Sequence, residues 1–147
     1  MTRPRLVLFL SISTLIVLGV LAWKLKHAPE SIKANSDPAM SYEKAGMHDE
    51  AADVYYRMLE QDPDNPGIYV NLAAIQVAKG NYEKAAELCE KALSLEPGNA
   101  TAHNNLAVAY YTLGKFELAI EHCDLAIKYG YKVKPELIKL LQPYREG

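Results

Sequence analysis

The sequence predicts an all-α protein in which helix–turn–helix units stack into a solenoid behind a single N-terminal transmembrane helix. Two observations lead to this fold class: residues 6–23 form an uncharged apolar run, and the glycines Gly46, Gly80 and Gly114 recur at one constant interval. A chain of 147 residues is expected to hold one folded domain. The expected parts are a short leader (1–5), a membrane helix (6–23), a tether (24–36) and a repeat domain (37–147).

The apolar run reads LVLFLSISTLIVLGVLAW and carries no charge. At 1.5 Å per residue, a helix over 6–23 spans roughly 27 Å, which is close to the hydrocarbon thickness of a bilayer. Arg5 and Lys24 bracket the run, and Trp23 lies where interfacial aromatic residues are common. The run therefore predicts a single-pass anchor in the lipid bilayer.

A cleaved signal peptide is the alternative, since Val20 and Ala22 fit the small-residue rule for cleavage after Ala22. The run is longer than the apolar core of most signal peptides, however, and lysines follow it at once. Basic residues flank both of its ends, so the positive-inside rule is nearly balanced. The short leader favours an extracytoplasmic repeat domain, which would be periplasmic in a bacterium.

The charge of the chain is unevenly distributed. Residues 37–124 hold 15 acidic and 6 basic side chains, whereas basic residues are in excess before and after them. Because an acidic surface repels phosphate, we expect no nucleic-acid partner for the folded part.

The interval between the glycines also separates many other similar residues. Equivalent positions hold the sets His48, Tyr82, Phe116; Ala51, Ala85, Ala119; Tyr55, Cys89, Cys123; and Met58, Ala92, Ala126. Within 83–95 the apolar residues fall on one face of a helix and the charged residues on the other. This pattern resembles that of tetratricopeptide repeats over residues 37–131. The resemblance implies two full units and one partial unit, each a pair of helices that buries its apolar side against a neighbour.

Both ends of the array depart from the repeat pattern. Pro38 stands where the later units have a leucine, so the first helix is expected to start late and to be short. After the last unit, residues 134–144 are amphipathic and predict a capping helix. Its apolar residues, Leu137, Leu140, Leu141 and Tyr144, are expected to cover the end of the stack.

The first helices of the two complete units, 66–78 and 100–113, contain no Asp, Glu, Lys or Arg. One stripe on them is expected to pack within the repeat. In the family that the chain resembles, a second stripe lines the concave side, where segments of partner proteins lie. The predicted groove consists of Met40, Val70, Asn71, Ala74, Val77, Ala78, Asn104, Asn105, Val108, Tyr111 and Thr112. A competing interpretation is that curvature and the capping helix shield this stripe and that its low polarity reflects core packing.

The chemistry of the predicted groove favours an apolar helix or strand as its ligand. Members of the family that bind chaperone tails clamp a C-terminal carboxylate with lysines and an arginine. Asn71 and Asn105 offer the amides of such a clamp, but the basic residues are missing from this stripe. Binding of chaperone tails is therefore not expected here.

No catalytic site, cofactor site or metal site is expected. His122 and Cys123 are adjacent on a helix, so their side chains diverge by about 100° and cannot readily share one metal ion. Cys89 and Cys123 fit the role of small buried hydrophobic residues, and His103 stands where a packing aromatic is usual. The sequence contains no phosphate-binding loop, no G-x-S-x-G motif and no haem attachment motif.

These observations lead to the hypothesis of a membrane-anchored adaptor or scaffold, and not an enzyme. Its predicted groove would dock another protein, a component of a membrane complex or an intermediate in its assembly. Two alternatives remain: a permanent structural subunit of such a complex, and a secreted repeat protein released by cleavage of a signal peptide.

Overall fold

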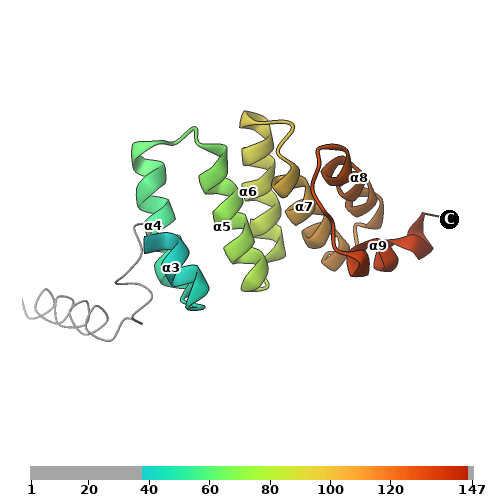
Figure 1. The fold of residues 1–147 in the computed structure, drawn as a ribbon, viewed down its shortest axis with the longest axis horizontal. Coiled ribbons are helices and arrows are strands. Elements are labelled where there is room, and N and C mark those ends of the chain that lie inside the picture. The colour runs from blue at the N-terminus through green and yellow to red at the C-terminus, as the bar shows by residue number, and fades with distance from the viewer. Residues whose placement is uncertain (1–37, 146–147) are drawn as a thin grey trace, which may run out of the picture. The chain divides into compact units, whose positions relative to one another are not determined.

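The computed structural model describes residues 38–145, which form seven α-helices and one short 3₁₀ helix, with no strand among them (Figure 1). The helices are α3 (Pro38–Lys44), α4 (His48–Gln61), α5 (Pro66–Ala78), α6 (Tyr82–Leu95), α7 (Ala100–Thr112), α8 (Phe116–Lys128), α9 (Pro135–Leu141) and the 3₁₀ helix η1 (Gln142–Tyr144). The expected leader, membrane helix and tether lie outside the described residues and stay predictions. Within the described part of the chain, no helix has the length and apolarity that a bilayer span requires.

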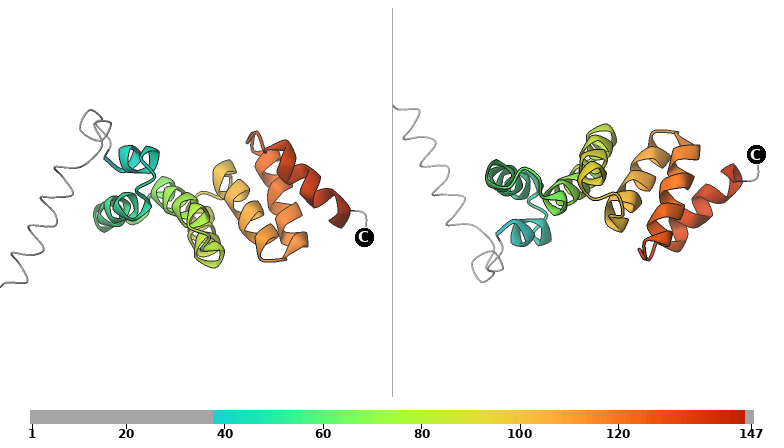
Figure 2. Two further views of the ribbon diagram at one scale, coloured as in Figure 1. Left: turned by 90° about the horizontal axis from the view of Figure 1, so that it is seen from below. Right: turned by 90° about the horizontal axis from the view of Figure 1, so that it is seen from above.

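The helices form three hairpins that follow one another in a row, with α9 at the far end (Figures 1 and 2). α3 packs on α4, α5 on α6 and α7 on α8. Contacts of α4 with α5 and of α6 with α7 join successive hairpins, and α5 also packs directly on α7. The predicted all-α solenoid of helix–turn–helix units is confirmed. The first helix is short, as Pro38 predicts: α3 has 7 residues, whereas α5 and α7 have 13 each.

Glycine ends the first helix of each hairpin. Gly80 and Gly114 adopt φ values of 79° and 73°, in the left-handed region that favours glycine. In both turns the following amide reaches back to the helix: Asn81 N donates to Gln76 O and Lys115 N to Tyr110 O, each at 2.9 Å. These bonds satisfy carbonyl groups that the end of a helix leaves unpaired, so the turn reverses the chain within a few residues.

Small side chains at equivalent positions of the hairpins form the core. Residues with no exposed surface include Ala51, Ala85, Ala119, Leu72, Leu106, Ala73, Ala107, Cys89, Cys123, Ala92 and Ala126. An alanine or a cysteine at a helix contact leaves room for the neighbouring backbone to approach. The constant interval of the sequence therefore repeats the same close contact from one hairpin to the next.

Asparagines begin two of the first helices. The side chain of Asn65 accepts a hydrogen bond from Gly67 N at 3.1 Å, and that of Asn99 accepts one from Ala102 N at 2.9 Å. Each bond satisfies an amide that has no partner within its helix. The two asparagines mark the joints between successive hairpins.

The C-terminal helix covers the stack with one of its faces only. Leu137 and Leu141 are buried, but Leu140 is 47% exposed and Tyr144 is 43% exposed. The prediction that all four residues cover the end of the stack is therefore wrong for Leu140, whereas the ring of Tyr144 does cover part of it by stacking on Phe116 of α8. Leu140 lies about 100° around the helix from Leu141, so the two side chains cannot both point at α8.

Candidate functional site

The uncharged first helices α5 and α7 lie next to each other and present their side chains in two sets. Leu72 and Gln76 on α5, with Leu106 and Tyr110 on α7, are buried. Ala73, Ile75, Ala107 and Ala109 are buried as well. The outward-facing residues include Asn71, Ala74 and Ala78 on α5 and Thr112 on α7, which are exposed. Because α5 and α7 pack directly on each other, the outward-facing residues of the two helices form one continuous surface without Asp, Glu, Lys or Arg.

Most residues of the predicted groove contribute to this surface. Met40, Asn71, Ala74, Ala78 and Thr112 are exposed, and Val77, Asn104, Asn105, Val108 and Tyr111 are half-buried. We call the nine of these residues that lie on α5 and α7 the first-helix surface, whereas Met40 is exposed on α3. Val70 does not belong to it, because it is only 6% exposed and lies in the hydrophobic core. The physical reason is that α5 has α4, α6 and α7 packed against it, so more of it is buried than one neighbouring helix would cover.

Some polar groups of the first-helix surface have hydrogen-bond partners within the described structure, and one does not. Asn71 donates through Nδ2 to the hydroxyl of Tyr55 on α4, at 3.1 Å, and so links two hairpins. Thr112 donates to the carbonyl oxygen of Val108 in its own helix at 3.0 Å. Asn105 differs, since its Nδ2 is buried and finds no hydrogen-bond partner in the described structure.

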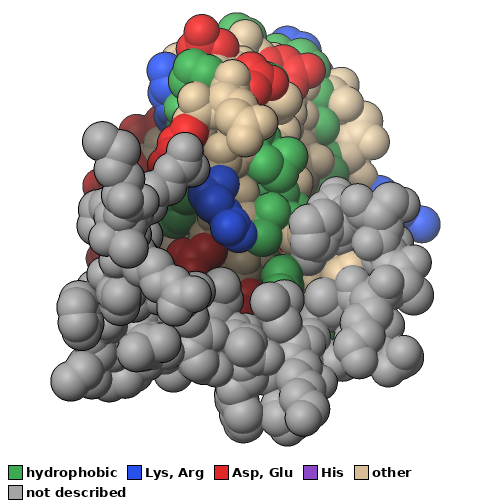
Figure 3. All heavy atoms as spheres, turned by 90° about the vertical axis from the view of Figure 1, so that its left-hand side faces the viewer, with side chains coloured by type: hydrophobic (Ala, Val, Ile, Leu, Met, Phe, Trp, Pro, Cys, Tyr) green, Lys and Arg blue, Asp and Glu red, His purple; other side chains and the backbone are tan. Residues whose placement is uncertain are grey.

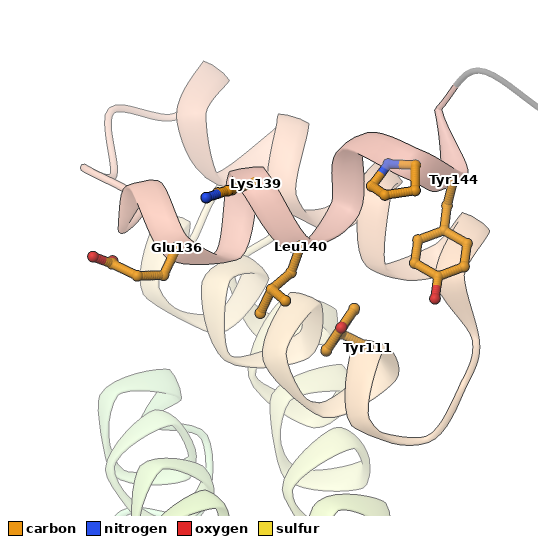
Figure 4. A pocket seen from close by; sticks show the side chains of 6 residues that line it. Tyr111, Glu136, Lys139, Leu140 and Tyr144 are labelled. Atoms are coloured by element: carbon orange, nitrogen blue, oxygen red, sulfur yellow. The ribbon is translucent and has the colours of Figure 1, made fainter.

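A pocket of about 490 Å³ lies at the α9 end of this surface. We call it the cap pocket; it is lined by Tyr111 of α7, by Glu136, Lys139 and Leu140 of α9, and by Pro143 and Tyr144 of η1 (Figure 4). Leu140 extends from α9 toward α7, where Tyr111 lies (Figure 4). The exposed face of the capping helix thus continues the first-helix surface rather than ending it.

The wall of the cap pocket is held in place from α8. Tyr144 stacks on Phe116 with ring centroids 3.7 Å apart, and Phe116 in turn lies 5.7 Å from the ring of Tyr111. Arg145 donates to both carboxylate oxygens of Asp124, at 2.5 and 3.0 Å. The stacked rings and the bidentate ion pair hold η1 against α8.

The cap pocket was not among the sites predicted from the sequence. Leu140 and Tyr144 are four residues apart and form a second apolar stripe, beside that of Leu137 and Leu141. Two apolar stripes on one short helix are the signal that could have indicated a surface beyond the core.

At the α3 end of the described array, two polar atoms are buried without a hydrogen-bond partner. They are Oε1 of Glu43, at the end of α3, and Nδ1 of His48, at the start of α4. Figure 3 looks onto this end and shows hydrophobic side chains exposed beside both acidic and basic ones on the part of the surface that is visible.

The cysteines have environments that disfavour their ionised form. Burial, with a smaller effect of Glu90, raises the pKa of Cys89 to about 12. Burial also raises the pKa of Cys123 above its ordinary value. Because the thiolate is the nucleophile and the metal ligand, both side chains act here as packing residues. Among residues 38–145, no group of three or more His, Cys, Asp and Glu side chains is placed to hold a metal ion.

Comparison with solved structures shows close agreement of the fold. The first TPR domain of Spaghetti (RPAP3), bound to the HSP90 peptide SRMEEVD, has 25% sequence identity and a TM-score of 0.68, over 73% of this chain and 87% of that one. The first TPR domain of human RPAP3 has 25% identity and a TM-score of 0.67, over 74% and 87%. The Sgt2 TPR domain from Aspergillus fumigatus has 28% identity and a TM-score of 0.65, over 80% and 78%.

Sequence comparison gives the family. No curated protein matches the chain. A family model described as tetratricopeptide repeat matches residues 42–88 and 76–142, which together cover most of the chain and all of the hairpins except the first residues of α3. With the glycine turns and the stacked hairpins, this match shows that the chain belongs to the tetratricopeptide repeat family.

Proposed function

We propose that this protein is an adaptor that docks an apolar segment of another protein on the first-helix surface. The observation that carries the proposal is the absence of Asp, Glu, Lys and Arg from both α5 and α7, although each helix presents a set of outward-facing residues. Surfaces of small proteins are rarely left apolar over a continuous area unless they bind something. The cap pocket supports the proposal, because it offers a hollow for one bulky side chain at the end of that area.

The ligand differs in character from the peptide bound to the RPAP3 domain. The peptide SRMEEVD ends in acidic residues, and binding such a tail calls for basic side chains. On this chain the nearby Lys79, which follows α5, forms an ion pair with Asp49 of α4. Lys139 is the sole basic residue among the described residues that form the first-helix surface and the cap pocket. A chaperone tail is therefore a poor fit for this protein.

Anchoring in a membrane is the second part of the proposal, and it rests on the apolar sequence of residues 6–23, the predicted membrane helix. An anchored domain meets a partner in the same membrane at a high effective concentration, so a surface of modest affinity is sufficient. We therefore favour a role in assembling or stabilising a membrane protein complex, with the repeat domain on the extracytoplasmic side. A permanent subunit would resist washing with salt and mild detergent, whereas an adaptor would dissociate. N-terminal sequencing of the mature protein would identify the secreted form.

The test is photo-crosslinking in native membranes with a photoreactive phenylalanine analogue at Ala74 or at Val108. Ser94 is the matched control, because it is exposed and lies on α6, a second helix. The expected result is the same crosslinked partner from Ala74 and Val108, and none from Ser94. Partner capture should be lost in A74E and V108E but retained in S94E, with unchanged helical content. Equal crosslinking from Ser94, or full capture by A74E and V108E, would refute docking on the first-helix surface.

A further inference from the structure

The first hairpin carries a polar pair where the later hairpins carry apolar or aromatic residues. Counted by the interval between the turn glycines, Glu43 is equivalent to Val77 and Tyr111, and His48 is equivalent to Tyr82 and Phe116. In the third hairpin these two places are in contact, since the rings of Tyr111 and Phe116 lie 5.7 Å apart. By the same repeat geometry, we expect the side chains of Glu43 and His48 to lie near each other on the same side of the array.

Each member of this pair has a buried atom that lacks a hydrogen bond within the described structure, namely Oε1 of Glu43 and Nδ1 of His48. Leaving a buried polar atom unpaired costs about 1–3 kcal/mol, and more for a charged group. Buried polar groups therefore nearly always have a partner, whether protein, water or ligand. A carboxylate oxygen only accepts hydrogen bonds, and a cation is its strongest partner.

A third unpaired group lies further along the described array. Asn105 is on α7, and its buried Nδ2 needs an acceptor. Inside a helix the backbone carbonyls are already bonded, whereas those of an extended segment are free. The unpaired amide thus favours an extended ligand over a helical one.

We propose that the partner segment is an extended chain that places a Lys or Arg side chain against Glu43 and His48 and a bulky apolar side chain in the cap pocket. This inference rests on the proposed function and specifies its ligand. The surrounding charge agrees, because residues 37–124 carry 15 acidic and 6 basic side chains and attract a cationic ligand. Asn105 then donates to a backbone carbonyl between the two anchors. The three unpaired atoms of the described array are buried, so the side chains of Glu43, His48 and Asn105 must rotate on binding to reach these partners.

The experiment uses the full chain in lipid nanodiscs and an array of capped synthetic peptides. Each peptide is built from Ala, Ser and Thr with one Phe, and one further position holds Lys, Arg, norleucine or Glu. Norleucine keeps most of the apolar stem of lysine and lacks its charge, so it separates charge recognition from apolar contact. The wild-type protein is expected to bind the best Lys and Arg peptides about tenfold more tightly than their norleucine counterparts, about 1.4 kcal/mol.

Three variants assign that preference to the polar pair. E43Q keeps the size of the side chain and should reduce the preference for Lys and Arg to less than threefold, while binding of norleucine peptides stays. E43K should reverse the preference toward Glu peptides. H48F restores the aromatic residue that the third hairpin carries at this place, and it should weaken the preference in part. E83Q is the matched control, since Glu83 is an exposed glutamate on α6, and it should bind like the wild type.

The outcomes separate this inference from the proposed function. An E43Q protein that keeps the full Lys and Arg preference would overturn the inference, and so would a wild type that binds norleucine peptides equally well. The latter result would mean that the polar pair encloses only water, while docking of apolar segments would still hold. If no peptide binds and the crosslinks from Ala74 and Val108 also fail, the proposed function itself is refuted. Circular dichroism of each variant shows whether the fold is retained.

Discussion

The imidazoles of His103 and His122 share one hydrogen bond, with their Nδ1 atoms 2.9 Å apart, while Nε2 of His103 lies 3.1 Å from the carbonyl oxygen of Pro97. A carbonyl oxygen only accepts, so Nε2 of His103 carries a hydrogen. In the neutral pair, Nδ1 of His103 is then the acceptor and Nδ1 of His122 the donor. The bond joins α7 to α8 inside the third hairpin, and it is lost if both rings become charged.

We predict that this pair makes the stability of the protein sensitive to mild acid. Burial lowers the pKa of His122, with a further contribution from His103, whereas Glu121 and Glu90 act in the opposite direction. A folded pKa below the ordinary value of about 6.5 means that the unfolded chain takes up the proton first. Stability is therefore complete above about pH 6.5 and decreases as the pH falls through the folded pKa. The urea midpoint at pH 7.5 and at pH 5 measures this loss.

The control for the acid effect is H122Q, in which an amide donor to His103 remains but the ionisable ring is gone. Its urea midpoint should fall less than that of the wild type between the two pH values. Equal losses in the two proteins would show that other groups cause the acid sensitivity.

We predict that both cysteines are unreactive in the folded protein. Cys89 and Cys123 have no exposed surface, and burial raises the pKa of each thiol. A disulfide reagent at pH 8 should modify neither thiol in the native state, and both in urea. Rapid native labelling of one thiol would show that its hairpin opens locally. Measuring the rate in increasing urea would then separate local opening from global unfolding.

We predict that G114A destabilises the fold by about 1–2 kcal/mol, the cost of a left-handed conformation for a residue with a side chain. A Cβ at Gly114 would meet nothing within 4 Å, so the cost arises from the backbone alone. G98A is the matched control, because its new methyl would make only an ordinary contact with the ring of Tyr129, at 3.5 Å. Denaturant titration of both proteins measures the difference, and similar stabilities would contradict the assigned turn.

We predict that N99A lowers the free energy of unfolding by about 0.5–2 kcal/mol, because it removes the side chain that begins α7. The lost bonds are the one from Ala102 N to Oδ1 of Asn99, at 2.9 Å, and the one from Nδ2 of Asn99 to Oε2 of Glu96, at 2.6 Å. N99D retains the acceptor for Ala102 N but brings a second carboxylate against Glu96, so it should recover only part of the loss. Thermal unfolding of the three proteins decides the point, and an equal loss in N99D would assign the effect to the asparagine amide instead.

We predict opposite phenotypes for two adjacent leucines of α9. L141A removes a side chain with no exposed surface and should cost about 2–5 kcal/mol of stability. L140A removes one that is 47% exposed, so stability should change by no more than about 0.5 kcal/mol. L140A should instead weaken binding of the peptides that carry Phe, because it widens the cap pocket. A stable L140A that binds normally would exclude this pocket as the anchor site.

The hairpins could be predicted from the sequence because their determinants are local. Gly80 and Gly114 end their helices through their own left-handed backbone conformation. Ala85 and Ala119 mark close helix contacts because their side chains are small. The division of the first helices into buried and outward-facing residues depends on how many neighbours each helix has. Val70 shows the difference, since helical periodicity places it with Ala74, but the additional packing on α5 buries it.

The candidate site was only partly predictable, because its ends depend on tertiary placement. Leu140 and Leu141 are chemically identical, and only the angle of α9 on α8 decides which of them is buried. In the same way, Glu43 is an ordinary helix residue in the sequence, and its unpaired oxygen is apparent only once burial is known. Comparison of equivalent places in the hairpins, and not any single motif, connects Glu43 to His48.

The asparagines that begin α5 and α7 have a consequence for how such an array can lengthen. The segment 66–99 starts directly after Asn65 and ends with Asn99, so it carries the starting signal for whatever helix comes next. A tandem copy of this segment inserted after Asn99 would have an asparagine at the start of each first helix. It would pack against the same hairpin surfaces that the present segment contacts. Duplication of one genetic module could therefore extend the protein by a whole hairpin without the design of a new junction.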